Sequence, residues 1–336
     1  MFSTKTNFKK CLLLVSLAMM VFITSCAEMM TTQPTIKMDA PPPQTPQLQT
    51  FKTTGEYLKA GKASFDAKQF DEAQAYLSDA VRLDQKNQAA HLLLGVTMVK
   101  LGKGADARRE FDKAVQIDAK TGDAETAKAW LKRLDNPLVV GIIPPKITVS
   151  SPVKSEIFDD RERIAEAAQI ILQKNLKFIP VVQSAYFQTL SKTFSACGFY
   201  STVEFDKLKS IIIDADTYRE NIGSTQILTP ISKTRTNDSM IGSFISRAKN
   251  KNVKILIAGS IEDYMSTERD GSSYNHTLTC GINIDLISVK DSRVIKRLSN
   301  KITHDKVKTD EIKDVITKTW DELFQKMALE IHNALL

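Results

Sequence analysis

The sequence predicts an α+β protein in which an all-helical N-terminal region of repeated hairpins precedes an α/β sandwich with a mixed, largely antiparallel sheet. Two observations support this fold class. Residues 54–135 match themselves when the chain is shifted by 34 positions, which indicates an internal helical repeat. From Val253 to Ser299, an apolar run is followed by strict apolar–polar alternation and two turn sequences, which indicates three consecutive strands in an antiparallel meander. Helical and strand patterns thus occupy separate parts of the chain, as in the α+β class.

The first 25 residues have the layout of a secretory signal peptide. Lys5, Lys9 and Lys10 precede the apolar segment Cys11–Ile23, which is too short to span a bilayer. We therefore expect residues 1–25 to be a targeting segment rather than part of the folded body.

A cysteine follows the apolar segment at once. Ile23, Thr24 and Ser25 lead into Cys26, and this order resembles the lipobox of bacterial lipoproteins. The resemblance implies cleavage before Cys26 and acylation of its thiol, as in palmitate-modified lipoproteins. Ala27 at the next position implies sorting to the outer membrane, where the lipid-anchored chain would face the periplasm. The alternative is an ordinary signal peptide with a chance cysteine.

The rest of the chain carries a small excess of positive charge. The formal net charge is +7, and removal of residues 1–25 takes away three lysines and no acids, which leaves +4. No block of five or more basic residues indicates a nucleic-acid partner. Residues 26–53 contain five prolines among Thr and Gln and few large apolar side chains, so we expect them to form an extended tether.

Small and apolar residues recur across the 34-residue shift in residues 54–135. Their spacing resembles the tetratricopeptide repeat, in which small residues let paired helices approach closely. The resemblance implies two helical hairpins, and Asp123–Leu134 is expected to add a helix with Trp130 on the end of the stack. The matching pairs are Gly61 with Gly95, Ala73 with Ala107, Leu77 with Phe111, Ala80 with Ala114, Val81 with Val115, Leu83 with Ile117 and Asp84 with Asp118.

The repeat resemblance also implies a concave groove lined by the first helix of each hairpin. Such a groove suits a partner peptide. The alternative is that this short stack closes on itself or docks on the neighbouring domain, so that the same residues are core. The expected groove residues are Leu58, Lys62 and Phe65, followed by Leu92, Leu93, Val96 and Val99.

Residues 136–336 are expected to form the α/β domain, because Asn136–Pro137 breaks the helical pattern. Gly198 stands where a helix stop belongs, and Thr309 with the two acids after it predicts a capped helix start. Met265–Asn275 is predicted to be a polar turn. The expected strands are Leu138–Ile143, Phe199–Phe205, Val253–Tyr264, Leu278–Leu286 and Arg293–Leu298, and the expected helices are Asp160–Lys174, Pro180–Cys197, Met240–Lys249 and Thr309–Leu335.

Three segments of this domain, Phe199–Leu208, Ala248–Tyr264 and Ile282–Arg297, carry a wider resemblance. Their order resembles the curli-secretion lipoprotein family (CsgG-like) and its relatives, the penicillin-binding-protein activator lipoproteins (LpoB-like), the exopolysaccharide-export lipoprotein of pel systems and the N-terminal domain of TolB. The resemblance covers most of residues 138–336. It implies a periplasmic recognition domain, often oligomeric, without an active site.

The sequence departs from the curli-secretion family in two segments. Channels of that family insert amphipathic hairpins into the outer membrane. Ser210–Asp238 and Met265–Thr277 are too polar to supply paired membrane strands of about ten residues each. A ring-shaped collar remains compatible with the sequence.

No catalytic or metal-binding pattern stands out. The four histidines, His91, His276, His304 and His332, are scattered among unlike contexts, so no metal site is expected. Ser260 lacks the glycine two residues later that a nucleophile elbow requires. We therefore expect no catalytic residue, no cofactor and no small-molecule substrate.

Cys197 and Cys280 are the only thiols left after processing, apart from the lipidated one. In an oxidising periplasm such a pair can form a disulfide. The alternative, favoured because Cys280 lies on the apolar side of its strand, is two buried small side chains.

Taken together, these features predict a non-enzymatic outer-membrane lipoprotein that acts as a protein–protein interaction scaffold or adaptor in cell-envelope assembly or export. Its partners would be envelope proteins or further copies of itself. The alternative is a ring-forming secretion or export component of the curli-secretion type.

Overall fold

The computed structural model describes residues 49–150, 153–155, 181–205, 213–222, 225–234, 238–270, 273–308 and 310–336. The expected signal peptide, Cys26 and nearly all of the expected tether lie outside these residues, as does the helix expected at Asp160–Lys174. Thr50–Leu336 forms one compact unit. Among the described residues, no helix is both long enough and apolar enough to cross a membrane.

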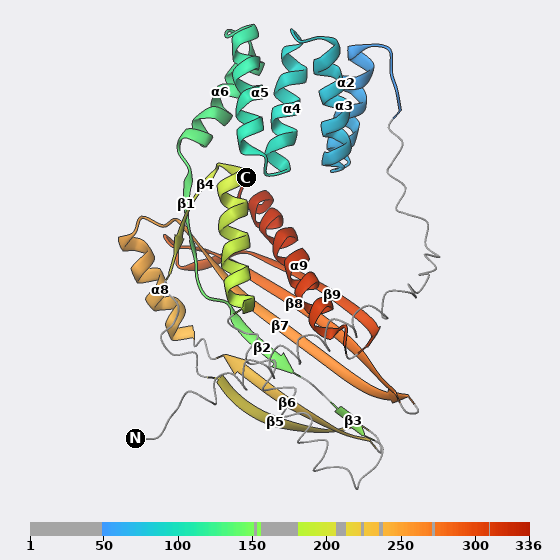
Figure 1. Cartoon of the computed structure of the whole chain (residues 1–336). Coiled ribbons are helices and arrows are strands. Elements are labelled where there is room, and N and C mark those ends of the chain that lie inside the picture. Colours follow the sequence, from blue (N-terminus) through green and yellow to red (C-terminus); the bar gives the residue numbers. More distant parts are fainter. Residues whose placement is uncertain are drawn as a thin grey trace, which may run out of the picture. The chain divides into compact units, whose positions relative to one another are not determined.

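The N-terminal part of this unit consists of helical hairpins (Figure 1), as the repeat pattern predicts. Side-chain caps define three of the helix starts. Thr53 and Glu56 form a reciprocal capping box, while Asn87 and Thr121 each accept a hydrogen bond from a backbone N–H of the first turn. The helices are α2 (Thr54–Asp66), α3 (Phe70–Leu83), α4 (Gln88–Lys100), α5 (Gly104–Ile117) and α6 (Gly122–Asp135).

The C-terminal part is a mixed sheet with helices on both faces, which confirms the α+β fold class. The strand β1 runs parallel to both β4 and β7, whereas β7, β8 and β9 form the predicted antiparallel meander. The strands are β1 (Leu138–Ile142), β2 (Lys146–Ser150), β3 (Val153–Ser155), β4 (Tyr200–Glu204), β5 (Ile213–Ile222), β6 (Thr225–Thr234), β7 (Ile255–Asp270), β8 (Ser273–Ser288) and β9 (Arg293–Val307).

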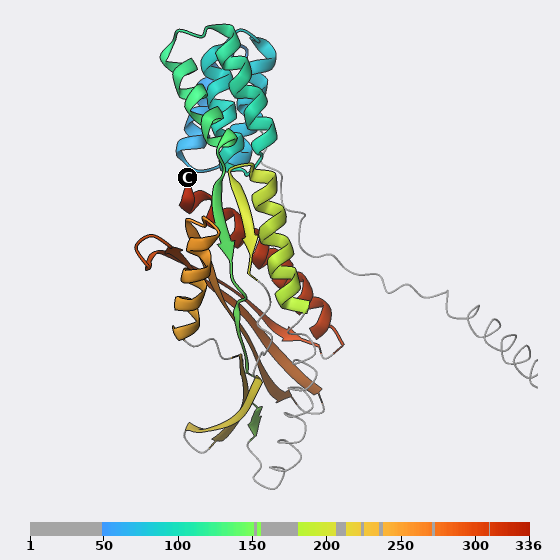
Figure 2. The ribbon, with the colours of Figure 1, turned by 90° about the vertical axis from the view of Figure 1, so that its left-hand side faces the viewer.

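Three helices belong to this part of the fold in the ranges that the structure describes. Residues 181–197 are helical, and Gly198 ends that helix with a φ of +71°, as expected for a glycine stop. Figure 2 shows this helix and α9 (Ile312–Leu335) on one face of the sheet and α8 (Asp238–Asn250) on the other. Because strand side chains alternate, β7 directs Ile257 and Ile261 towards the first face and Leu256 towards the second.

Several predicted boundaries are wrong. Met265–Asn275 is not a turn, because β7 and β8 stay paired as far as Asp270 and Ser273. The strands β5 and β6, which the sequence pattern does not predict, lie within the polar segment Ser210–Asp238 and pair along ten residues each. Backbone hydrogen bonds form this ladder whatever the polarity of the side chains. The final helix begins at Ile312, where the preceding residue Glu311 makes no side-chain capping bond; Thr309, the expected cap, lies outside the described residues.

Candidate partner-binding surface

Close contact between paired helices shapes the repeat surface. A Cβ atom on Gly61 would lie 2.6 Å from Leu77 Cγ, and one on Gly95 would lie 2.6 Å from Phe111 Cε1. Both distances are shorter than carbon atoms tolerate, so glycine is needed in the first helix of each hairpin. The 34-residue match thus identifies residues that set the distance between α2 and α3 and between α4 and α5.

The residues expected to line the groove fall into two groups. On α2, Leu58 and Phe65 are half-buried and Lys62 is exposed, and Leu93 of α4 packs half-buried beside them. On α4, Leu92 and Val96 pack against the main core, and Val99 is fully buried within it. The first group is accessible to a partner, whereas Val99 is not.

Val99 is buried because the end of α9 docks beside it. The Nε2 atom of His332 donates a hydrogen bond to the Val99 carbonyl at 2.6 Å, and Asn333 Nδ2 donates to the Lys100 carbonyl at 3.3 Å. The His332 Nδ1 atom lies 2.9 Å from the Tyr200 hydroxyl. The Tyr200 hydroxyl also lies 3.1 Å from the backbone carbonyl oxygen of His332, and burial lowers the pKa of the imidazole, which favours the neutral ring. The C-terminal helix therefore closes the α4 end of the expected groove.

The turn between α4 and α5 makes the second contact with the C-terminal part. A Cβ atom on Gly104 would lie only 2.0 Å from the backbone carbonyl oxygen of Cys197, and one on Gly102 would lie 3.0 Å from its Sγ atom. Gly102 also has a φ of +70°, which favours glycine. This turn thus lies directly against the end of helix 181–197.

Aromatic side chains extend the same junction along α6. As expected, Trp130 lies on the end of the repeat, where its ring stacks on Phe111 with the centroids 6.1 Å apart. It also meets Phe199 edge to face at 6.0 Å. The Arg133 guanidinium lies over both Trp130 and Phe199 and donates a hydrogen bond to the Leu336 carbonyl at 3.2 Å. One continuous core therefore joins the repeat to the sheet and α9.

A buried polar pair inside the repeat is absent from the sequence prediction. His91 is buried, with Nδ1 at 2.6 Å from a carboxylate oxygen of Glu110 and Nε2 at 3.1 Å from the Gln85 carbonyl. The two side chains lie 19 positions apart on different helices, so no local spacing rule reveals them. Both ring nitrogens of His91 have partners within the fold, which assigns this histidine a structural role.

The structure does not contain the disulfide considered from the sequence. Cys197 and Cys280 are both free and buried. Cys197 lies under the α4–α5 turn, whereas the Cys280 thiol faces Asp263 of the neighbouring strand with Sγ 4.0 Å from Oδ1. The two thiols thus occupy separate environments, each as a small buried side chain.

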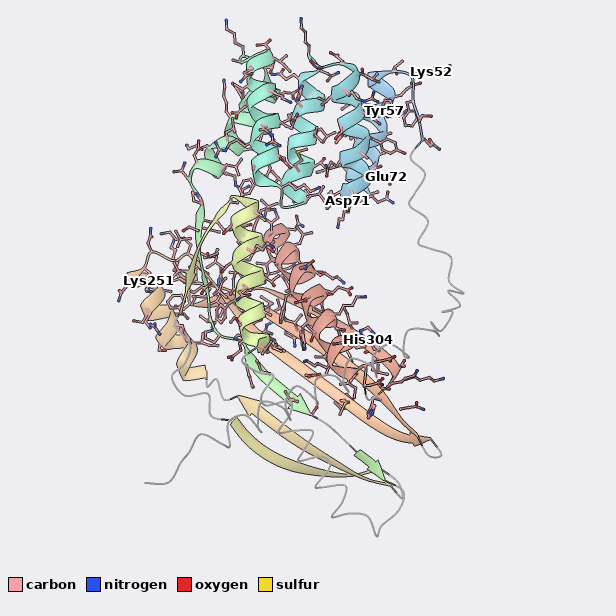
Figure 3. All side chains as sticks on the ribbon, viewed as in Figure 1. Lys52, Tyr57, Asp71, Glu72, Lys251 and His304 are labelled. Atoms are coloured by element: carbon pink, nitrogen blue, oxygen red, sulfur yellow. The ribbon has the colours of Figure 1, made fainter. Side chains whose placement is uncertain are left out.

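Asp263 is the most perturbed acid of the described residues. Its carboxyl group is buried between the sheet and the helices of the first face, and this burial raises its pKa to about 7. No group of three or more potential metal ligands occurs in the described ranges. His304, labelled in Figure 3, bonds to Thr319 of α9 at 2.8 Å. These polar groups join strands and helices of the fold.

A cavity of about 210 Å³ lies between α8 and the polar part of the sheet. Its apolar side is formed by Ile143, Ile241 and Phe244. Two of its polar side chains already have partners, since Asp285 accepts a hydrogen bond from Arg297 and Asn283 accepts one from Ser299. The half-buried surface on α2 and α4 is therefore the stronger candidate for binding.

Comparison with known families identifies the repeat. Residues 64–134 match the tetratricopeptide repeat family, whose members generally mediate protein–protein interactions and are typically not enzymes. The match covers the part of the chain from the end of α2 to the end of α6. Comparison with curated proteins gives no match.

Three solved structures are similar to parts of the chain. The TPR domain of Arabidopsis OM64 is 22% identical, covers 24% of this chain and 71% of its own, and has a TM-score of 0.22. A putative neuraminyllactose-binding hemagglutinin homolog from Helicobacter pylori is 14% identical, with 60% and 84% covered and a TM-score of 0.29. Lipoprotein GNA1162 from Neisseria meningitidis is 7% identical, with 56% and 98% covered and a TM-score of 0.26.

Proposed function

We propose that this protein is a non-enzymatic, lipid-anchored scaffold of the outer membrane that faces the periplasm and holds a partner segment on α2 and α4. The observation that carries the proposal is the half-buried apolar surface of Leu58, Phe65 and Leu93 beside the exposed Lys62. Apolar side chains at helical spacing suit a segment that inserts apolar anchors, and Lys62 suits an acidic group next to them.

The shared core at the junction with the sheet supports the scaffold role. Because α4, α5 and α6 share a core with α9 and the sheet, a segment bound to the repeat would be held beside the C-terminal part. A partner on the repeat and a second partner on the sheet would then be brought together in cell-envelope assembly or export.

A crosslinking experiment in cells tests the partner surface. A photoreactive amino acid replaces Lys62 in one variant and Lys86, which is exposed in the turn between α3 and α4, in a control variant. We expect a discrete crosslinked product from position 62 that is absent from position 86. The same products from both positions, or none from position 62, would contradict the proposed surface.

The membrane anchor has a separate test. The lipobox resemblance at Ile23–Cys26 supports acylation of Cys26. We expect the wild-type protein to incorporate radiolabelled palmitate and to be recovered in the outer-membrane fraction. We expect Cys26→Ala to lose both the label and the recovery in that fraction. Unchanged fractionation and labelling of Cys26→Ala would remove the anchor from the proposal without affecting the partner surface.

A ring-forming export component is the second candidate function, and the edge of the sheet favours it. Among the described strands, β9 pairs only with β8, so fifteen residues from Arg293 to Val307 present one free edge. Pairing with another copy would extend the sheet. Light scattering of Thr50–Leu336 over a concentration series distinguishes the two functions, because a discrete multimer supports the ring and a monomer supports the scaffold.

A further inference from the structure

Two loops at one end of the sheet lie side by side and share a strong positive charge. The backbone N–H of Val289, before the β8–β9 turn, donates a hydrogen bond to the Lys254 carbonyl, in the loop between α8 and β7, at 3.0 Å. Figure 3 labels Lys251 at the end of α8. Six exposed cations lie in these loops, at the end of α8 and at the start of β9, and we call them the basic end: Lys249, Lys251, Lys254, Lys290, Arg293 and Lys296.

The acidic groups beside the basic end do not neutralise it. Among the described residues, Asp291 accepts a hydrogen bond only from the neutral Ser288 hydroxyl, at 2.8 Å, so it keeps its charge and lowers the sum of the six cations from +6 to +5, whereas Asp285 pairs with Arg297 at 3.1 Å. Within the described ranges, none of the six cations pairs with a carboxylate. The ammonium group of Lys254 bonds only to the neutral side-chain amide of Asn252, and the ammonium group of Lys251 lies over the Phe205 ring. The positive charge is therefore available to an outside partner.

Two aliphatic side chains are exposed within the same hairpin. Val294 is 38% exposed and Ile295 is 46% exposed, between Arg293 and Lys296. The pairing of β8 with β9 shifts here, so that Ile287 faces Val294 and Leu286 faces Lys296, and Ile295 has no partner residue. Such a bulge redirects side chains. The hairpin thus presents a cation, two aliphatic side chains and a second cation in succession.

We propose that the basic end docks on an anionic phospholipid bilayer. Headgroup phosphates match the six cations, and the boundary between headgroups and acyl chains accepts Val294 and Ile295 while the neighbouring cations stay at the surface. A purely acidic protein segment would match the charge but would offer no apolar contact to the two aliphatic side chains. This docking is independent of the partner surface on α2 and α4 and of the lipid on Cys26.

Vesicle binding by Thr50–Leu336 tests the proposal, because this unit is compact by itself and lacks the lipidated cysteine. The probes are phosphatidylcholine vesicles with and without about one-third phosphatidylglycerol, a composition chosen to create a negative surface potential. We expect co-sedimentation with the anionic vesicles only, and its loss at high salt. Equal sedimentation with both kinds of vesicle, or with neither, would overturn the proposal.

Matched variants assign the binding to the basic end. Each cation near an anionic surface changes partitioning about fivefold, so Lys290→Gln, Arg293→Gln and Lys296→Gln together are expected to weaken it by about a hundredfold. The control is Lys59→Gln, Lys86→Gln and Lys120→Gln, which removes the same charge from exposed positions of the repeat and is expected to change partitioning less than threefold.

The aliphatic residues have their own test. Val294→Ser with Ile295→Ser keeps every charge and is expected to weaken partitioning several-fold. Equal partitioning of the charge variant and its control would overturn the proposal. The proposal would also be overturned if an acidic envelope protein bound the wild-type basic end but not the charge variant, while the vesicles remained unbound.

Discussion

Residue 104 is glycine because the backbone carbonyl of Cys197 leaves no room for a side chain there. Gly104 is the first residue of α5, and the equivalent position one repeat earlier, the first residue of α3, is Phe70. The two positions differ because only α5 begins against the C-terminal part, where a Cβ atom would lie 2.0 Å from the Cys197 carbonyl oxygen. The repeat pattern identifies Gly61 and Gly95 from the sequence, but it cannot identify Gly104, whose contact is made with a residue outside the repeat.

Gly104→Ala is therefore expected to destabilise the protein. The backbone carbonyl cannot move away as a flexible side chain could, so the added methyl group should cost about 2–3 kcal/mol in the free energy of unfolding. Urea denaturation measures this change. The control is Gly122→Ala, at the same position of α6, where nothing lies within 4 Å of the added atom and stability should stay the same or rise slightly. Equal effects of both substitutions would contradict the contact.

At Asp263, burial opposes ionisation. The pKa of the carboxyl group is about 7 in the fold, against 3.8 for an ordinary aspartate, so the folded state prefers the protonated form. The folded state therefore loses stability as the pH rises from about 4 to about 7, and the loss is complete above that range.

Asp263→Asn should remove this pH dependence, because an amide resembles the protonated carboxyl group. The difference in unfolding free energy between the variant and the wild type should shift in favour of the variant by up to about 4 kcal/mol from pH 4 to pH 8. Urea denaturation at several pH values tests this. A difference that stays constant between pH 4 and pH 8 would show that the carboxyl group titrates as it does in the unfolded chain.

At the scale of elements, α9 has two tasks. Most of its length covers the sheet through residues such as Leu323 and Phe324, and its last turn seals α4 through His332. The apolar spacing in the sequence predicts the first task. It does not predict the second, because the partners of His332 are the Tyr200 hydroxyl and the Val99 carbonyl, which is 233 positions away.

A double-mutant cycle tests the sealing role of α9. His332→Phe leaves the buried Val99 carbonyl and Tyr200 hydroxyl without their bonds to the imidazole, and should cost about 2–4 kcal/mol in unfolding free energy. Tyr200→Phe should cost about 1 kcal/mol alone. The Tyr200 hydroxyl keeps its bond to the backbone carbonyl of residue 332, but its bond to the imidazole is lost in either single variant, so the cost of the double variant should be below the sum of the two single costs. Simple additivity would show that the two side chains are not coupled.

Other elements show where sequence patterns have limited power. The alternation in β8 predicts a half-buried strand, because one side of it packs against α9 and the other does not. In β5 and β6 no such contrast is visible in the sequence, and pairing alone defines them as strands. Sequence periodicity therefore identifies the central meander of β7, β8 and β9 but does not identify the hairpin of β5 and β6.

At the scale of the whole molecule, the repeat and the sheet form one unit. The change from helical to strand pattern in the sequence coincides with the end of α6 at Asp135 and the start of β1 at Leu138. The shared core around Phe111, Trp130 and Phe199 is not foreseeable, because it depends on pairs of residues far apart in the chain. For the same reason, only part of the expected groove is open. Leu58, Phe65 and Leu93 stay accessible, while Val99 is covered by the docking of α9.

The docking of the end of α9 also affects the order in which parts of the fold are completed during synthesis. His332 lies 233 positions after Val99 in the chain, so the repeat helices are synthesised well before the residues that cover Val99. Until His332 has been synthesised, the nascent chain carries an incompletely covered surface on α4. Truncation before His332 would leave that surface uncovered although every repeat helix is present.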